Sequence, residues 1–593
     1  MSTTTAASKV ALARFLRLHA SRLVRSRSML LVALGTVIGV VAAAVVYVVG
    51  RLTSVLHAVL FGLPYDAHLS AQEALASPYM AVVPVVGGAI LGGSIILARR
   101  FRTRPPVDPI EANAVHGGLM SFRESLIVTS QTVISSGFGA SVGLEAGFTQ
   151  LSSAIGSWLG SRLRLRRNEI RLLVGCGAAG AIAAAFGAPI TGAFYAFELI
   201  IGVYSAGTLA PVLAAALSAS FFAQQLGVLQ APISLGTVPA LAARDIVPFM
   251  ALGVVCALVS IAMMLMVAWI EQGLSRLKLQ QPLRPAIGGI AVGLLALATP
   301  AVLSTGHGAL VVQLAAQASL ASVALVFALK FLASCISLGA GFRGGLFFAS
   351  LLMGAMLGKF YGLALAQTGL APDIDVLLAS VVGMASLAAG VVGGPLTMAF
   401  LVLEMTRDLA ISAAVMVAAG LAALLVRELF GFSFSTWRLH LRGENVRSAH
   451  DVGRLRNLTV QRMMRADIRT VTERTTIGEF RLLFPLGSTE RVVVTDTSGR
   501  YAGIVVVADA FQPRPEGESP QQTISPLLRY RDNFLLPGLN AADAAATFKR
   551  VGSEELAVVD NLGNRNVVGL LTEAHLLRRY AEELDKGLKD LTG

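Results

Sequence analysis

The stretch PITGAFYAFE at residues 189–198 is matched by PLTMAFLVLE at residues 395–404. Proline, threonine, alanine, phenylalanine and glutamate recur at the same spacing, and both stretches lie in apolar surroundings. Membrane proteins built from two related halves carry such internal repeats, and their substrate sites usually lie near the bilayer midplane where the halves meet. The pair therefore predicts an inverted-topology repeat with a site between its halves.

Composition places most of the chain in a membrane. The 593 residues are 55% hydrophobic and 14% charged, with a mean hydropathy of +0.69, which is too apolar for a water-soluble protein of this size. A helix of about 20 apolar residues crosses the hydrocarbon layer. An all-α multi-pass membrane domain is expected from the apolar runs, which occupy residues 29–50, 79–98, 171–203, 208–226, 246–270, 286–303, 309–340, 345–368, 375–405 and 409–430.

The net charge of +13 comes largely from arginines that flank these runs, at residues 1–27, 99–104 and 162–171. This distribution is typical of the positive-inside rule and not of nucleic-acid binding. It predicts that all three clusters face the cytoplasm. The cysteines Cys176, Cys256 and Cys335 lie far apart in apolar runs, and we interpret them as small buried hydrophobic residues without metal.

Composition also divides the chain into domains. We predict a basic cytoplasmic segment at 1–27, a membrane domain at 28–440, a polar linker at 441–457 and a soluble α+β domain at 458–590. The soluble part contains its own repeat, because residues 491–509 and 556–575 both read as strand, Asp/Gly turn, strand and helix.

Two glycine-rich segments form a second sequence repeat between the halves. Residues 137–145 (GFGASVGLE) and 339–347 (GAGFRGGLF) share three glycines and a leucine at a constant offset. Irregular backbone at membrane depth is tolerated where it lines a cavity or is covered by protein. Helices that begin at Gly143 and Gly345 would direct their N–H groups and positive ends at such a cavity, where an anion fits. The alternative is close helix packing through small residues.

Glu145 is the most informative functional candidate in the first segment. A carboxylate among Gly, Ala, Val and Leu at membrane depth is costly unless it is paired, held by helix N-termini or protonated. At a helix start it could occupy an anion site as a tethered competitor, and protonation would release it. The alternative is a structural carboxylate in the first helical turn.

These residues resemble the CLC family of chloride channels and chloride/proton exchangers. The segment GLEAG at 143–147 is similar to the family pattern G-[KR]-E-G-P, and GLFFA at 345–349 is similar to G-x-F-x-P, with the prolines lost in both. The resemblance implies transport of chloride or a similar small anion across a bacterial-type inner membrane, by a homodimer with a pore in each subunit. It implies Glu145 as the gate and an anion path along Pro106, Gly143, Leu144, Gly147, Gly345, Leu346, Phe347 and Ser435.

The chain departs from the family at several positions. Pro106 stands where the family has a coordinating hydroxyl, a change that accompanies nitrate preference in some relatives, and Ser435 stands at the pore tyrosine. Asp108 would repel an anion unless it faces solvent or pairs with an arginine. Leu199 stands where exchangers carry an internal proton-transfer glutamate. This favours channel-like conduction, with a chloride or nitrate/proton antiporter as the alternative.

Arg343 has a candidate electrostatic role. The family often has a basic residue before the gating glutamate, where this chain has Leu144, and Arg343 lies in the matching segment of the other half. We expect Arg343 to supply the attractive field instead. The alternative is an arginine that extends to the membrane surface. Glu198 and Glu404 of the first repeat are expected to be structural.

The repeat at 458–590 resembles a pair of CBS modules, which often bind adenine nucleotides. The ribose-binding pattern is split, because the first module has Asp509 with Val506 and the second has Thr572 with His575. An adenine nucleotide at Asp509 or Thr572 is one reading, and a structural, dimer-stabilising role is the other.

Two other function classes compete with anion transport, and neither is an enzyme. A CBS-bearing divalent-cation transporter would need acidic residues along its membrane path, where this chain has few. A membrane scaffold with a degenerated pore would explain the lost prolines. No metal or other cofactor is expected in the membrane domain.

Overall fold

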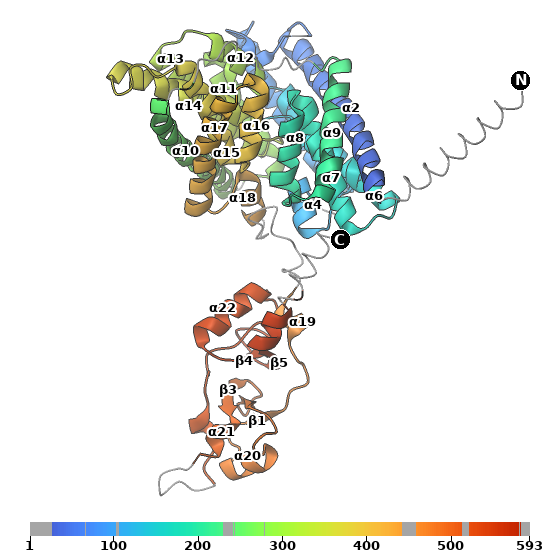
Figure 1. The fold of residues 1–593 in the computed structure, drawn as a ribbon, viewed down its shortest axis with the longest axis vertical. Helices are drawn as coiled ribbons and strands as arrows, with labels where there is room; N and C mark the ends of the chain where they lie inside the picture. Colours follow the sequence, from blue (N-terminus) through green and yellow to red (C-terminus); the bar gives the residue numbers. More distant parts are fainter. Residues whose placement is uncertain are drawn as a thin grey trace, which may run out of the picture. The chain divides into compact units, whose positions relative to one another are not determined.

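The computed structural model divides into two compact units, residues 1–451 and 452–593 (Figure 1). The structure describes residues 27–65, 67–101, 106–228, 241, 243–277, 279–441, 458–512, 521–579 and 582. The basic segment predicted at 1–27 lies outside these residues except for Arg27, and so does the linker predicted at 441–457 except for Leu441.

The first unit is helical and contains two series of helices in the same order. The first series is α2 (Arg27–Phe61), α3 (Val83–Phe101), α4 (Pro109–Val115), α5 (Phe122–Gly137), α6 (Glu145–Arg162), α7 (Arg167–Phe186), α8 (Pro189–Tyr195) and α9 (Ala206–Gln225). The second is α10 (Ile246–Arg276), α11 (Arg284–Ala298), α12 (His307–Ala315), α13 (Leu320–Gly339), α14 (Phe347–Thr368), α15 (Val376–Val392), α16 (Pro395–Thr406) and α17 (Leu409–Leu429), followed by α18 (Phe434–Leu441).

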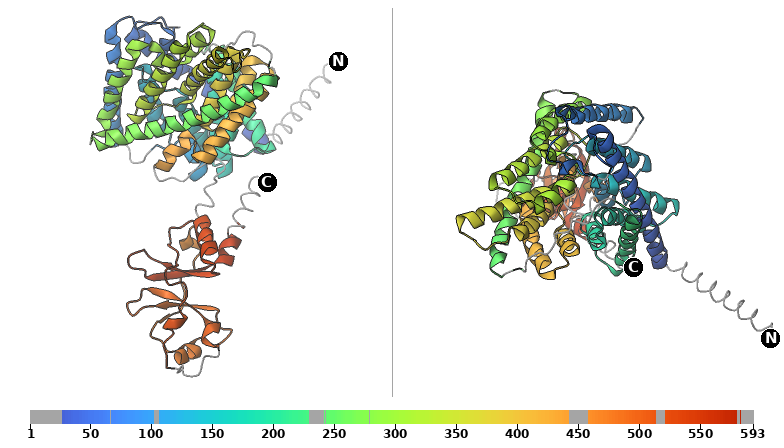
Figure 2. Two further views of the ribbon diagram at one scale, coloured as in Figure 1. Left: turned by 90° about the vertical axis from the view of Figure 1, so that its left-hand side faces the viewer. Right: turned by 90° about the horizontal axis from the view of Figure 1, so that it is seen from above.

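Equivalent helices pack in equivalent pairs. In the first half α2 packs on α7 and α9, and in the second half α10 packs on α15 and α17. Likewise α6 packs on α7, and α14 packs on α15. Figure 2 shows the blue-to-teal helices of the first half gathered on one side and most green-to-orange helices of the second half on the other. The inverted-topology repeat predicted from the sequence is confirmed.

Within the described part of the chain, nine helices are long and apolar enough to cross a membrane. The innermost helices of the unit are α7 and α14, which belong to these nine, and the shorter apolar helix α15, and their central residues are buried on all sides. Small residues permit this packing, because a side chain at Gly354 or Gly383 would collide with the carbonyl of the other. The prediction of a multi-pass membrane domain is therefore confirmed.

Short helical turns connect the long helices. They are η1 (Leu69–Ala71), η2 (Pro78–Val82), η4 (Ala243–Asp245), η5 (Gln281–Leu283) and η6 (Pro300–Val302). The π-helical turn η3 (Ala196–Ile201) directly continues α8 and ends at Gly202, whose φ of 76° lies in the left-handed region. Such π-turns are often found at functional positions.

The second unit is α+β. Strands β1 (Thr470–Thr472), β2 (Arg491–Thr495) and β3 (Tyr501–Val506) form one sheet in that order, and β4 (Glu555–Val559) and β5 (Val567–Thr572) form an antiparallel pair. Val494 faces Gly503 as Val558 faces Gly569, each beside a register shift. The strand–turn–strand–helix repeat predicted from the sequence is thus present. The helices are α19 (Val460–Met463), α20 (Ile477–Leu483), η7 (Ser525–Leu527), α21 (Val507–Ala510) and α22 (Ala541–Val551), with further helical residues at 573–579.

Candidate functional site in the membrane unit

The two glycine-rich segments pair with each other across the halves. The N–H of Gly143 donates to the carbonyl of Gly345 at 2.9 Å, and the N–H of Gly345 donates to the carbonyl of Gly143 at 3.1 Å. Because these N–H groups are used in the pair, the helices begin two residues later, α6 at Glu145 and α14 at Phe347. The prediction that the helices begin at the glycines was wrong by these two residues.

Two buried serines hold the same segments in place. The N–H of Ser141 donates to Ser337 Oγ and the N–H of Arg343 donates to Ser135 Oγ, both at 3.0 Å. Ser135 and Ser337 lie near the ends of α5 and α13 and are fully buried. The irregular backbone at membrane depth therefore keeps its hydrogen bonds inside the protein.

The Glu145 side chain turns back from the start of α6 to the start of α14. It is 4% exposed, and the N–H of Phe347 donates to its Oε1 at 2.6 Å. A Cβ atom added at Gly345 would lie 2.6 Å from Oε1, and one added at Gly143 would overlap the carboxylate. Glycine at these two positions thus leaves the space in which the carboxylate sits, beside the positive end of α14.

A cavity of about 180 Å³ reaches this carboxylate. Sequence-predicted residues that line it are Pro106, Glu145, Arg343, Gly345, Leu346, Phe347 and Ser435. The structure therefore brings together residues that are more than 300 positions apart in the chain.

Three predicted residues do not line this cavity. Leu144 is buried in the apolar core of the first half. Gly147 lies in the first turns of α6, where an added Cβ would meet the Thr132 side chain at 3.2 Å. Gly143 borders the carboxylate, but its N–H is paired with Gly345.

Cationic side chains contribute to the lining of the cavity. Arg343 and Arg438 line it together with Asp108, whose Oδ1 accepts the N–H of Glu111 at 2.8 Å and so caps α4. An adjoining cavity of about 340 Å³ shares Arg343 and Arg438 and adds Arg99, Arg284 and Glu271. The lining of the two cavities thus carries more basic than acidic side chains, which attracts anions.

Tyr195 is a cavity residue that the sequence reasoning missed. Its ring lies 6.1 Å from that of Phe347, and its side chain lies against Thr149 in the cavity wall. An aromatic residue on an apolar helix normally indicates core packing. The available signal was that the repeat places Leu401 at the equivalent position.

Lys330 was also missed. It lies on α13 and is fully buried. The signal was present, since Lys330 is the one charged residue in the apolar run 309–340, and ionisable residues inside membrane segments are usually functional.

Glu198 and Glu404 each cap the start of a short helix in the other half. Glu198 accepts the N–H groups of Leu396 and Thr397 at 2.9 and 2.7 Å, with the Thr397 hydroxyl at 2.6 Å. Glu404 accepts the N–H groups of Ile190 and Thr191 at 2.8 Å each, with the Thr191 hydroxyl at 2.5 Å. Each carboxylate therefore binds the first turn of the equivalent helix in the other half, as expected of structural residues.

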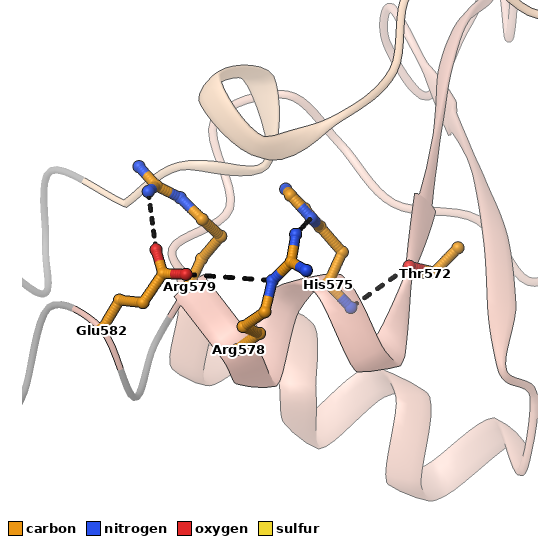
Figure 3. A network of polar contacts seen from close by, with 5 residues as sticks. All are labelled: Thr572, His575, Arg578, Arg579 and Glu582. Carbon is orange, nitrogen blue, oxygen red and sulfur yellow. Dashed lines mark hydrogen bonds and ion pairs between the residues drawn. The ribbon is translucent and has the colours of Figure 1, made fainter.

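In the second unit the two predicted nucleotide residues have protein partners. Asp509 forms an ion pair with Arg529 at 2.7 Å. Thr572 Oγ1 accepts the N–H of His575 at 3.2 Å and so caps the helical residues 573–579, of which Arg578 and Arg579 form ion pairs with Glu582 (Figure 3). Over the whole described part of the protein, no group of three or more His, Cys, Asp or Glu side chains lies close enough to hold a metal ion.

Comparison with known proteins identifies the family. The model for the voltage-gated chloride channel family matches residues 87–427. A chloride channel protein of Ralstonia nicotianae, described as ClcB-like, is 32% identical over 342 residues, which cover 56% of this chain and 79% of that protein. The voltage-gated ClC-type chloride channel ClcB of Escherichia coli is 28% identical over 358 residues, 60% of this chain and 85% of its own length.

Solved structures show the same fold. A slow cyanobacterial Cl⁻/H⁺ antiporter has a TM-score of 0.59 at 21% identity, covering 70% of this chain and 97% of its own. A CLC-type fluoride/proton antiporter has a TM-score of 0.56 at 22% identity, covering 67% and 95%. A eukaryotic CLC transporter has a TM-score of 0.56 at 16% identity, covering 92% and 97%.

The chain is a multi-pass membrane protein of a family that moves anions, and not an enzyme. It belongs to the CLC family of voltage-gated chloride channels and transporters. Membership of this family is evidence against the divalent-cation transporter that the sequence analysis considered as an alternative.

Proposed function

We propose that the protein moves chloride or a similar small anion through a pore that Glu145 gates. The observation that carries the proposal is the hydrogen bond from the N–H of Phe347 to the Glu145 carboxylate, at the end of a cavity bordered by arginines. The N-terminus of a helix is an anion-binding position. The carboxylate occupies it as a tethered anion, and a free anion that enters from the cavity competes with it.

Conduction in this proposal is channel-like. Leu199 cannot carry a proton, and it lies beside Glu198, whose carboxylate is held by the first turn of α16. The alternative is a chloride or nitrate/proton antiporter in which protons pass through water or another side chain. The antiporter names of the relatives of known structure favour this alternative.

Liposome flux distinguishes these functions. Purified protein should carry chloride and not potassium, and a proton gradient should not drive chloride uphill if conduction is passive. Glu145→Gln should keep anion flux and remove its dependence on pH, because the neutral amide cannot be released by protonation. Loss of all flux, or an unchanged pH dependence, would contradict the gating role.

We further propose that the protein is a homodimer of the bacterial inner membrane and that its second unit is a cytoplasmic pair of CBS modules. The similar strand–turn–strand–helix units and the eukaryotic CLC relative, which covers a larger share of this chain than the first unit alone, support this assignment. Because Asp509 is paired with Arg529, a structural role is favoured over binding of an adenine nucleotide.

A further inference from the structure

Lys330 binds the backbone that leads to the gate. Its Nζ donates to the carbonyls of Val302 and Ser304 at 3.1 and 3.0 Å. Ser304 in turn contacts the first glycine-rich segment, since its N–H donates to Gly139 at 3.3 Å and its hydroxyl contacts the Ser136 hydroxyl at 2.9 Å. The buried ammonium is thus linked through Ser304 to the backbone segment that leads to Glu145.

Lys330 and Glu145 each keep one unused position for a hydrogen bond. An ammonium has three N–H donors, and among the described residues Lys330 uses two. Glu145 Oε2 is buried and has no hydrogen-bond partner in the described part of the chain. Lys330 and Glu145 are also close enough to attract each other electrostatically. A spare donor and a spare acceptor of opposite charge therefore lie in one buried region.

Lys330 also lies away from the arginine-lined cavities. α13 runs from Leu320 to Gly339, and Leu338 and Gly339 line the second cavity. Lys330 comes nine residues before Gly339, which is roughly 13 Å along the helix. A carboxylate that an incoming anion displaces would move away from those cavities, because the anion arrives through them.

We propose that Lys330 is the residue on which the ionised Glu145 carboxylate docks when an anion takes its place at the start of α14. This inference rests on the proposed gating function. The spare N–H of Lys330 would replace the hydrogen bond that Phe347 gives in the closed state. Without such a partner, an ionised carboxylate would have to leave a helix N-terminus for apolar surroundings, which is costly. Lys330 is accordingly a positioning residue, since it acts through Glu145.

Other charged and titratable groups lie around Lys330 and Glu145. They are the same in all the variants that the experiment below compares. Three of them are histidines: His57, whose Nε2 contacts the Ser136 carbonyl, and His68 and His307, whose rings lie 5.3 Å apart. The charged and titratable groups that line the two arginine-lined cavities, besides Glu145, are Asp108, Tyr195, Arg343, Arg438, Arg99, Arg284 and Glu271.

Lys359 provides a matched control. It is also buried, and its Nζ also donates to two carbonyls, those of Gln313 and Ala316 at 2.5 Å each. Both lysines therefore hold two backbone carbonyls of the second half. The electrostatic partner of Glu145 among them is Lys330.

The test compares chloride flux at pH 7.5 and 4.5 for Lys330→Met and Lys359→Met, each with Glu145 and with Glu145→Gln. Lys330→Met should lower flux at least tenfold at pH 7.5, where an ionised carboxylate needs the docking partner. It should leave flux at pH 4.5 unchanged, because a protonated carboxyl needs no cation. Lys359→Met should change the two fluxes by the same factor.

The Glu145→Gln background separates docking from structural damage. There Lys330→Met should have no effect at either pH. Equal loss at both pH values, or the same loss in the Glu145→Gln background, would overturn the docking role. If Glu145→Gln alone keeps the full pH dependence, the proposed gate fails, whatever Lys330→Met does.

Discussion

The two halves of the membrane unit share their hydrogen bonds and differ in their charges. Gly143 and Gly345 form two backbone hydrogen bonds with each other. Ser135 and Ser337 each bind the glycine-rich segment of the other half. Glu198 and Glu404 each bind the first turn of a helix in the other half. At the same offset, however, Ser141 corresponds to Arg343, Glu145 to Phe347 and Val128 to Lys330. The first half thus contributes the carboxylate of Glu145, and at the equivalent positions the second half contributes the cations Arg343 and Lys330.

This difference has a physical reason. Two carboxylates at Glu145 and at position 347 would repel each other and the anion, and each would need its own helix N-terminus. With Phe347 in the second half, the start of α14 keeps a backbone N–H for the carboxylate of the first half. Symmetric contacts therefore hold the irregular backbone, and the asymmetric side chains leave one carboxylate, that of Glu145, at the start of α14.

The largest expected effect comes from removing a symmetric contact. Glu198→Ala and Glu404→Ala each delete three hydrogen bonds to a carboxylate and leave a helix start uncapped. Each should lower the free energy of unfolding by about 3 kcal/mol or more. The two losses should be similar, as measured by thermal unfolding of the purified protein in detergent.

The exposed Glu428 beside Arg427 supplies the control, and Glu428→Ala should leave the unfolding temperature nearly unchanged. A Glu198→Ala protein that unfolds like the wild type but loses flux would contradict the equivalent structural roles of Glu198 and Glu404. In that case Glu198 would act in transport, not in capping.

An intermediate effect is expected where the halves differ in charge. Arg343→Gln should lower chloride flux several-fold at low ionic strength, because the arginine borders the cavity that leads to Glu145. The loss should shrink above about 0.5 M salt, where charges are screened within a few ångström. Arg162→Gln, at the exposed end of α6, is the matched control and should behave as the wild type. An unchanged salt dependence in Arg343→Gln would remove the electrostatic role.

The sequence predicted the repeat, the membrane class and some of the residues that line the cavity, because their signals can be read from the order of residues alone. Glycine spacing around 143 and 345 and an acid at 145 can be recognised without coordinates. The sequence does not show whether a backbone N–H group is already hydrogen-bonded, because the Gly143–Gly345 pair joins residues 202 positions apart. Tyr195 was missed for the same reason, because its neighbours Thr149 and Phe347 come from other helices. Lys330 was visible in the sequence as a charge in an apolar run, but its link to Glu145 appears only in the folded protein.

The smallest expected effect tests whether symmetric serines have asymmetric consequences. Ser135→Ala and Ser337→Ala each leave one buried N–H group without its acceptor, that of Arg343 and that of Ser141. Both should lower the free energy of unfolding by about 1–2 kcal/mol, by the same amount within error. Flux should fall modestly in Ser135→Ala alone, because its N–H partner carries the Arg343 side chain at the cavity, whereas Ser141 carries no charge. Equal changes of flux in both variants would mean that the serines act only through the shared backbone pair, and that the charge at position 343 tolerates small shifts of the segment.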